Sequence, residues 1–194
     1  MSRIRLKVQG VTDISANLDS SLLILTDEAE KRQLTVICDA AMRFQFAIRR
    51  GRHVGSKEAR QHAVEFLQYA LPEAVASLIK YLTNLELCVV IVNIFDGQYR
   101  AVLEDQRTGT AIPIRVSDGA LLSYADQHIP LYCEESIWQM QSMPYAGENA
   151  PGISMPLNTL TIPMLQKALD DCIEQENYEM AQKIKEEMER RIKD

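Results

Sequence analysis

The chain has 194 residues, 46% hydrophobic and 25% charged, with a formal net charge of −6 at pH 7. These proportions are ordinary for a globular protein with a core, and the acidic balance argues against a general nucleic-acid coat protein. Contact with nucleic acid would therefore need a local basic patch. The N-terminus lacks a signal-peptide pattern, and no apolar run approaches the roughly 20 residues of a membrane helix. We therefore expect a cytoplasmic protein without a membrane partner.

Four cysteines are scattered along the chain, and no two of them have the C-x-x-C spacing of a zinc site or redox dithiol. In a reducing compartment such residues behave as small hydrophobic side chains. We expect them to be buried and free. They are Cys38, Cys88, Cys133 and Cys172.

Short strands with turn residues between them are predicted in the first forty residues. Apolar and charged residues alternate over 4–8, and short apolar runs follow at 22–25 and 34–38. The polar residues 27–31 separate the last two runs, as in a hairpin loop. The chain therefore opens with strands of an antiparallel sheet.

A basic cluster follows the first predicted helix. Asp39 is expected to cap a helix over residues 40–48, and Gly51 to end it. Cationic side chains at this end either pair with the helix C-terminus or bind an anion. We predict a nucleic-acid contact for these residues, with the helix pairing as the alternative. They are Arg49, Arg50, Arg52 and His53.

The middle of the chain predicts two helices and then a β-meander. Apolar spacing indicates helices over 57–69 and 73–82, the second opened by Pro72. The β-branched run 87–94 is typical of a buried central strand. Asp96-Gly97 is a strong hairpin signal, so the meander is expected to continue to residue 115.

The corner after this meander combines a cation, a hydroxyl and a carboxylate: Arg115, Ser117 and Asp118. A helix is expected over 118–127 and a short strand over 131–133. Ser117 or Asp118 would suit the N-cap of that helix. Arg115 and Asp118 would also suit a partly buried ion pair that joins strand to helix. The remaining interpretation is an active site.

The C-terminal part separates by composition into a linker and two helices. Residues 143–158 are rich in proline and glycine, and residues 159–194 carry two apolar stripes at helical spacing. Asn177 is expected to cap the second helix. A hairpin this short must dock on its own domain, on a second copy or on a partner protein, and the linker favours an exposed interaction module. The predicted organisation is 1–142, 143–158 and 159–194. The fold class is α+β, a mostly antiparallel sheet or meander with packed helices, followed by an αα-hairpin.

Residues 3–142 resemble the bifunctional nuclease domain family. The family pattern is a strand, Arg-Pro-Ser-Asp-Ala, a helix and then Ala-Pro-Ile-Tyr; Arg115, Ser117, Asp118, Ala120 and residues 130–132 match it. The resemblance implies hydrolysis of DNA and RNA phosphodiesters with Mg²⁺ or Mn²⁺, whose ligands the sequence does not identify. Arg115 would clamp a phosphate, Asp118 would bind the cation or act as base, and Ser117 would hold Asp118 or donate to the phosphate.

Several positions depart from the family pattern. Val116 and Gly119 stand where proline and alanine are usual, residues 74–76 replace Thr-His-Asp, and residues 41–42 replace Glu-Ala. The alternative function is therefore a degenerate nuclease-like domain that serves as a scaffold or adaptor.

Residues 159–194 resemble the UVR motif, a helical hairpin of the excision-repair UvrB and UvrC proteins that binds other proteins. The match depends on the apolar stripes and on residues 176–179. It implies a protein partner, which would contact Leu169, Ile173, Tyr178, Ala181 and Ile184. Because the meander has an open edge, and such edges are usually paired or covered, we also expect a homo-oligomer.

Overall fold

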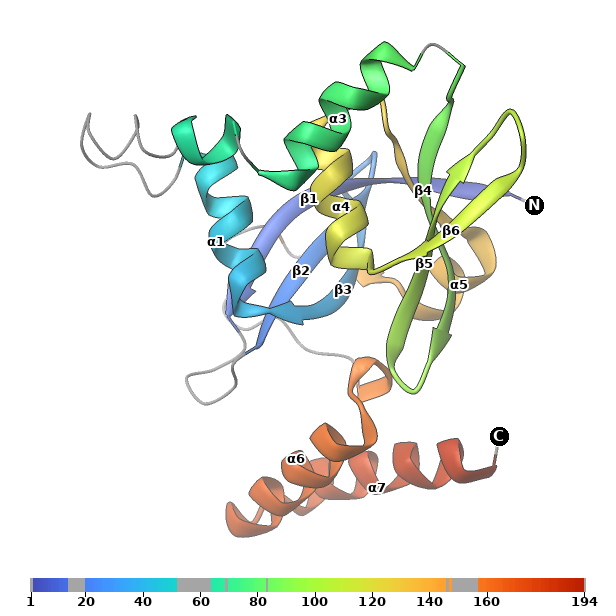
Figure 1. Ribbon diagram of the computed structural model, residues 1–194. Helices are drawn as coiled ribbons and strands as arrows, with labels where there is room; N and C mark the ends of the chain where they lie inside the picture. The colour runs from blue at the N-terminus through green and yellow to red at the C-terminus, as the bar shows by residue number, and fades with distance from the viewer. Residues whose placement is uncertain are drawn as a thin grey trace.

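The computed structural model describes residues 2–13, 20–51, 64–68, 70–82, 84–145, 147 and 157–193. Its described strands form one eight-stranded sheet in the order β6-β5-β4-β7-β1-β2-β3-β8, with helices packed against it (Figure 1). The strands are β1 (Arg3–Asp13), β2 (Ser20–Asp27), β3 (Arg32–Asp39), β4 (Leu87–Phe95), β5 (Gln98–Asp105), β6 (Thr110–Ile114), β7 (Leu131–Glu134) and β8 (Met143–Pro144). The helices are α1 (Ala40–Arg49), α3 (Leu71–Tyr81), α4 (Val116–Ala125), α5 (Glu135–Gln141), η1 (Leu157–Thr159), α6 (Ile162–Glu174) and α7 (Tyr178–Lys193). The predicted α+β class with a C-terminal helical hairpin is confirmed.

Two antiparallel meanders, β1–β2–β3 and β4–β5–β6, are joined through β7. Leu131 in β7 pairs with Leu6 of β1 in the antiparallel sense and with Val89 of β4 in the parallel sense. The sequence predicted both meanders and the short strand at 131–133. It did not predict that this strand would unite the two halves of the sheet.

The turns and the first helix cap follow their local signals. Asp96 and Gly97 have φ angles of 46° and 70°, the left-handed conformation that a tight Asp-Gly hairpin requires. Asp39 caps α1, because its carboxylate accepts a hydrogen bond from the N–H of Met42 at 3.1 Å. These predictions are confirmed. Residues 64–68 are helical, and the rest of the helix expected over 57–69 lies outside the described residues.

The core forms where α1 and α4 pack on the sheet. Phe46 of α1, Ala120 of α4, Val89 and Ile91 of β4 and Leu131 of β7 are each at most 1% exposed and belong to one cluster. Burying a large apolar side chain of this kind stabilises the fold by about 1.5–3 kcal/mol. This cluster fixes α4, and with it the corner that precedes α4.

Gly119 allows α4 to approach β4 closely. A Cβ atom at this position would lie 2.6 Å from Cγ1 of Val89, which is fully buried. The alanine that is usual at this position in the family that the sequence resembles therefore has no room here unless Val89 moves.

The C-terminal hairpin has a small core of its own that also touches the sheet. Leu165 of α6 and Ile184 of α7 are 0% and 1% exposed, and Ile37 of β3 packs against the same cluster. Asn177 caps α7 as predicted, its side-chain oxygen accepting the N–H of Met180 at 3.3 Å. Figure 1 shows the hairpin beside the β4–β5 turn, reached through η1.

The expected linker starts later than predicted, because Met143 and Pro144 pair with β3 as strand β8. Tyr145 continues this contact by donating its N–H to the carbonyl of Lys31 at 2.9 Å. Residues 148–156 of the expected linker lie outside the described residues. In the described part of the chain, no helix is both long and apolar enough to span a bilayer.

All four cysteines are free, and Cys38, Cys88 and Cys133 are buried as expected. Cys172 is half-buried on α6. Burial raises the pKa of the Cys38 and Cys133 thiols to about 12, which keeps them protonated at neutral pH. These two thiols are packing groups rather than nucleophiles.

Candidate functional site

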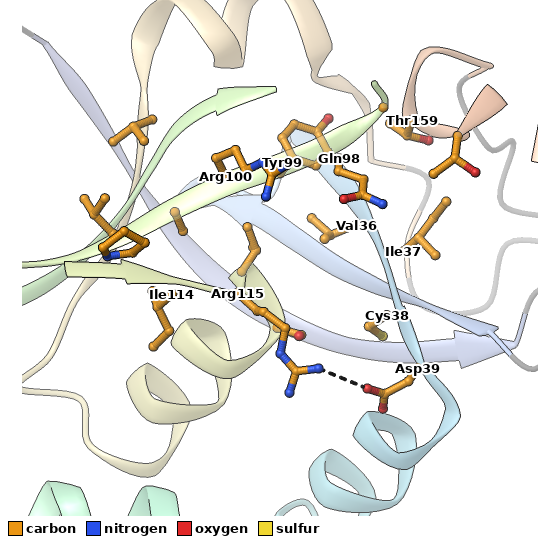
Figure 2. A pocket seen from close by; sticks show the side chains of 18 of the residues that line it. Val36, Ile37, Cys38, Asp39, Gln98, Tyr99, Arg100, Ile114, Arg115 and Thr159 are labelled. Carbon is orange, nitrogen blue, oxygen red and sulfur yellow. Dashed lines mark ion pairs between the residues drawn. The ribbon is translucent and has the colours of Figure 1, made fainter. Parts of the chain in front are cut away.

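Arg115 lies between the end of β6 and the start of α4 and holds two carboxylates. Its Nε is 2.6 Å from Oδ2 of Asp118 and its Nη2 is 3.1 Å from Oδ1. Its Nη1 is 3.6 Å from Oδ2 of Asp39, at the junction of β3 and α1 (Figure 2). The hydrogen bond with Asp118 raises the pKa of the guanidinium, so Arg115 is always charged. The corner therefore includes Asp39, which the sequence indicated only as a helix cap.

The predicted cap at this corner is wrong. Helix α4 begins at Val116 with Arg115 as its N-cap residue, and no side chain accepts a capping hydrogen bond there. Ser117 and Asp118 are the second and third residues of the helix. Asp118 still favours the helix start, because its negative charge lies near the positive end of the helix dipole. Its main partner, however, is the guanidinium.

The Arg115–Asp118 ion pair is more exposed than the partly buried pair that the sequence predicted. The side chain of Arg115 is 68% exposed and that of Asp118 is 34% exposed. Pairs of this kind contribute only about 0–1 kcal/mol to stability. The three charged groups are therefore accessible to a ligand, and little of the folding free energy depends on them.

The corner opens onto a pocket with a volume of about 790 Å³. It is lined by the end of β3, by β5 with Val92 of β4, by the β6–α4 corner, and by the start of the C-terminal hairpin. Figure 2 shows Asp39, Arg115, Gln98 and Arg100 around this pocket, with Thr159 contributed from the hairpin side. Ser117 also lines it, and its hydroxyl has no hydrogen-bond partner within the described ranges.

Arg100 is a second cation of this pocket that sequence reasoning missed. It is exposed on β5, between the buried residues Tyr99 and Ala101, and its guanidinium has no bonded partner in the described part of the chain. The alternation of buried and exposed residues on β5 placed Arg100 on the outer face. It gave no signal that β3 and the hairpin would lie nearby.

A second pocket, of about 990 Å³, lies on the other side of the same corner, between α1, α3 and α4. Arg115 and Asp39 line both pockets, whereas Asp118 lines only the second. The other described lining residues of this second pocket are mostly apolar. The charged corner therefore lies between two pockets whose other described lining residues are largely apolar.

The two described residues of the predicted basic cluster, Arg49 and Arg50, lie away from this corner. Asp39 caps the start of α1 and Arg49 ends it, so the length of a ten-residue helix, about 15 Å, separates them. The side chain of Arg49 is only 4% exposed, donates to both carboxylate oxygens of Glu73 and joins α1 to α3. Arg50 covers Gly10 and donates to the carbonyl of Val8 at 3.4 Å. Arg52 and His53 lie outside the described residues.

Arg49 and Arg50 thus have structural roles that the sequence did not indicate. The described partners of Arg49 lie in α1 and α3, and a ligand meets almost none of its surface. Neither residue lines the pocket beside Arg115. Among the described residues, the arginines that line it are Arg100 and Arg115.

A divalent cation would find two carboxylates at this corner. Across the described residues, no three His, Cys, Asp or Glu side chains form a metal-binding group. Asp39 and Asp118 contact different nitrogens of Arg115 from two different elements, and Mg²⁺ commonly takes one or two carboxylates with water and substrate phosphates. Either carboxylate therefore has the chemistry of a ligand for such an ion, which would compete with Arg115 for it.

The residues predicted to bind a protein partner divide into two groups. Ala181 and Ile184 are 8% and 1% exposed and pack inside the hairpin. Leu169 is half-buried in the same cluster. Ile173 and Tyr178, at the turn between the helices, are 51% and 66% exposed. Only the turn end of the hairpin presents large apolar side chains from this set.

No protein-family model matches the chain, and no curated protein matches it. The function is therefore argued from the geometry of the Arg115 corner and its pocket.

Proposed function

We propose that this protein hydrolyses phosphodiester bonds of nucleic acid at the Arg115 corner. The observation that carries the proposal is an exposed guanidinium, held between two carboxylates, on the wall of an open pocket. Phosphoryl transfer needs a positive group on the phosphate and an acid–base group near the attacking water. Arg115 and the two aspartates have these properties.

Each residue has a role suited to its position. The planar guanidinium of Arg115 binds phosphate oxygens in pairs, as it binds Asp118 here. Asp118 accepts a proton from the attacking water, and Ser117 donates its hydroxyl to a phosphate oxygen. Asp39 holds Arg115 from the opposite side, at the junction of β3 and α1.

Mg²⁺ or Mn²⁺ belongs to this proposal as a cofactor. Asp118 would hold it, with Asp39 as the alternative ligand. When bound, such an ion neutralises charge on the phosphate and lowers the pKa of a bound water. The site residues position the phosphate with or without it.

Cleavage of labelled single-stranded DNA and RNA, with Mg²⁺, Mn²⁺ or EDTA, tests the proposal. We expect activity in the wild type and a loss of about 100-fold or more in Arg115→Ala and Asp118→Asn, the usual cost of removing an electrostatic group. Arg107→Ala, in the β5–β6 turn, is the matched control and should cleave normally. Because the Arg115–Asp118 pair is exposed, both variants should melt within a few degrees of the wild type. A wild type without activity under all three conditions, or a fully active Arg115→Ala variant, would contradict the proposal.

The second candidate function is an adaptor that binds a protein partner through the hairpin. It is favoured by the exposed side chains of Ile173, Tyr178 and Met180 around the α6–α7 turn, which are 51%, 66% and 39% exposed. A partner would be retained by the full-length wild type and lost from the Ile173→Ser/Tyr178→Ser double variant. Gln182→Ala, on an exposed position of α7, is the control. Equal retention by all three proteins would count against this function.

We also propose that the protein, which we expect to be cytoplasmic, associates with itself through an open edge of the sheet. The edge strand β6 supports it: Ile112 is 60% exposed, and no described strand pairs with the outer side of β6. Pro113 lacks an N–H and limits the pairing that this edge offers. Light scattering at micromolar concentration should give the mass of a dimer or larger assembly, and Ile112→Lys should reduce it. A monomeric wild type would exclude self-association at that concentration.

A further inference from the structure

The pocket beside Arg115 lies where the curvature of the sheet brings β3 close to β5. Strands β3 and β5 are separated by β4, β7, β1 and β2 in the sheet order, yet some of their Cα atoms lie within 8 Å of each other. Strand β6 pairs only with Ala101–Asp105 of β5. Residues 98–100 of β5 therefore have no β6 neighbour, and the pocket occupies the gap between them and the end of β3.

Beyond Gln33, no described strand pairs with the outer edge of β3, and this part of β3 faces the gap. Tyr145 donates its N–H to the carbonyl of Lys31, on the side of β3 away from β2. Backbone groups of alternate residues in a strand point to the same side, so those of Ile37 and Asp39 also face away from β2. In the part of the chain that the structure describes, β8 pairs only with Arg32 and Gln33. The pocket therefore has backbone donors and acceptors along one wall.

The C-terminal hairpin forms the third wall. Thr159, Thr161 and Met164 line the pocket from η1 and the start of α6. Arg191 of α7 holds this segment in place by donating to the carbonyls of Leu157 and Leu160. The hairpin therefore contributes directly to the pocket as well as packing beside it.

The charge of the pocket favours an anion. Its described charged lining residues are Arg100, Arg115 and Asp39, which give a net charge of +1 in a chain whose net charge is −6. A local positive field of this kind concentrates phosphate groups. Two arginines on one pocket match a ligand with more than one phosphate along a backbone.

The volume of the pocket restricts the form of that ligand. About 790 Å³ is within the range of pockets that enclose a small molecule, about 300–1,000 Å³. It accommodates a short piece of one nucleic-acid strand and excludes a duplex. Proteins that bind single strands combine a positively charged groove that follows the phosphate backbone with contacts to the unstacked bases.

We infer that the pocket between β3, β5 and the C-terminal hairpin binds single-stranded nucleic acid, with Arg100 on a phosphate beside the one at Arg115. The inference rests on the proposed function, whose substrate class it specifies. It adds two elements, Arg100 and the docked hairpin, to the substrate site.

Fluorescence anisotropy with a labelled 12-nucleotide strand and with the corresponding duplex tests the substrate class. The wild type should bind the single strand at least tenfold more tightly. Arg100→Ala should weaken this binding about tenfold, the contribution of one charge-assisted contact, and should reduce the salt-dependence slope by about 0.7. Arg107→Ala, on the same β-hairpin but away from the pocket, should bind as the wild type does.

A second pair of variants tests the hairpin wall. Arg191→Ala removes the contacts to the carbonyls of Leu157 and Leu160, whereas Arg190→Ala removes the neighbouring arginine, which is paired with Glu187. We expect weaker single-strand binding in Arg191→Ala and wild-type binding in Arg190→Ala. Circular dichroism at the same temperature checks that both variants keep their helices.

The outcomes separate this inference from the proposed function. If the wild type cleaves and Arg115→Ala does not, while Arg100→Ala and Arg191→Ala bind normally, the inference is overturned and the proposed function stands. If Arg100 and Arg191 are needed for single-strand binding but no cation gives cleavage, the inference stands and the proposal of phosphodiester hydrolysis is overturned. Equal affinity for the duplex overturns the substrate class. Binding of an extended peptide but of no oligonucleotide overturns both.

Discussion

The guanidinium of Arg191 in α7 lies 3.2 Å from the carboxylate of Asp96 in the β4–β5 turn. At the next residue, Gly97, a Cβ atom would lie 2.4 Å from the carbonyl oxygen of Leu160. The turn and the hairpin therefore touch through backbone as well as through charge. Of the three docking sites left open by the sequence, the hairpin's own domain is occupied here, and the turn end with Ile173 and Tyr178 stays exposed.

Gly97→Ala should loosen the hairpin from the sheet. Its φ of 70° is unfavourable for alanine, and the new methyl group would collide with backbone at Leu160. Gly109→Ala is the matched control, because its φ is 71° but nothing lies within 4 Å of its added Cβ. Hydrogen exchange in α6 and α7 should accelerate in the first variant only. Equal exchange in both variants would show that the contact at Leu160 does not hold the hairpin.

Arg49→Ala should destabilise the fold by about 3–5 kcal/mol, because it leaves the carboxylate of Glu73 without its nearly buried partner. Urea denaturation measures the change. Arg43→Ala, an exposed position of the same helix, should cost less than about 1 kcal/mol. Adding Glu73→Ala to Arg49→Ala should cost less than the sum of the two single changes. A fully additive pair would mean that the two side chains do not interact.

Gly119→Ala should destabilise the protein by about 1–2 kcal/mol, although alanine is the better helix former by about 1 kcal/mol. The reason is the 2.6 Å approach to Cγ1 of Val89. Thermal unfolding of this variant, of Val89→Ala and of the double variant measures the coupling. The cost of Gly119→Ala should disappear in the Val89→Ala background. If Gly119→Ala is more stable than the wild type, helix propensity rather than packing against Val89 determines the stability at this position.

Stability should fall in acid partly through Asp105. Hydrogen bonds from the Thr108 hydroxyl at 2.7 Å and from the N–H of Glu86 at 3.1 Å lower the pKa of its carboxyl. The charged form therefore stabilises the fold above the unfolded pKa of about 3.9, and this contribution is lost as pH falls through the lower folded value. Urea midpoints of the wild type and Asp105→Asn should differ at pH 6, and the difference should shrink as the pH falls through the lowered folded pKa. Thr108→Val, which removes the first of these hydrogen bonds, should show a smaller version of the same change. Parallel pH curves for the wild type and Asp105→Asn would contradict the assignment.

The features that the sequence predicted correctly depend on neighbours in the chain. The Asp96-Gly97 turn, the Asp39 cap and the Asn177 cap each need only a few adjacent residues. Both meanders also follow from alternation and turn signals within a short span. Such signals are readable because the groups that interact are close in sequence.

The features that the sequence did not predict arise from contacts between distant segments. Asp39 meets Arg115 only because β7 and the curled sheet bring β3 near the end of β6. Arg49 is spaced like a surface cation, but the packing of α3 against α1 puts Glu73 beside it. Arg100 joins the pocket through the same curvature. The composition of the pocket is therefore a tertiary property that no local pattern contains.

The position of β7 has a kinetic consequence. Each meander is built from neighbouring hairpins, which form within about 1–10 μs. The two meanders unite only when β7 (Leu131–Glu134) pairs with both β1 and β4. Strand β1 lies more than a hundred residues before β7 in the chain. Contacts of such long sequence separation slow folding. We therefore expect β7 to be the late step, and to set the time at which two independent hairpin sheets become a single folded protein.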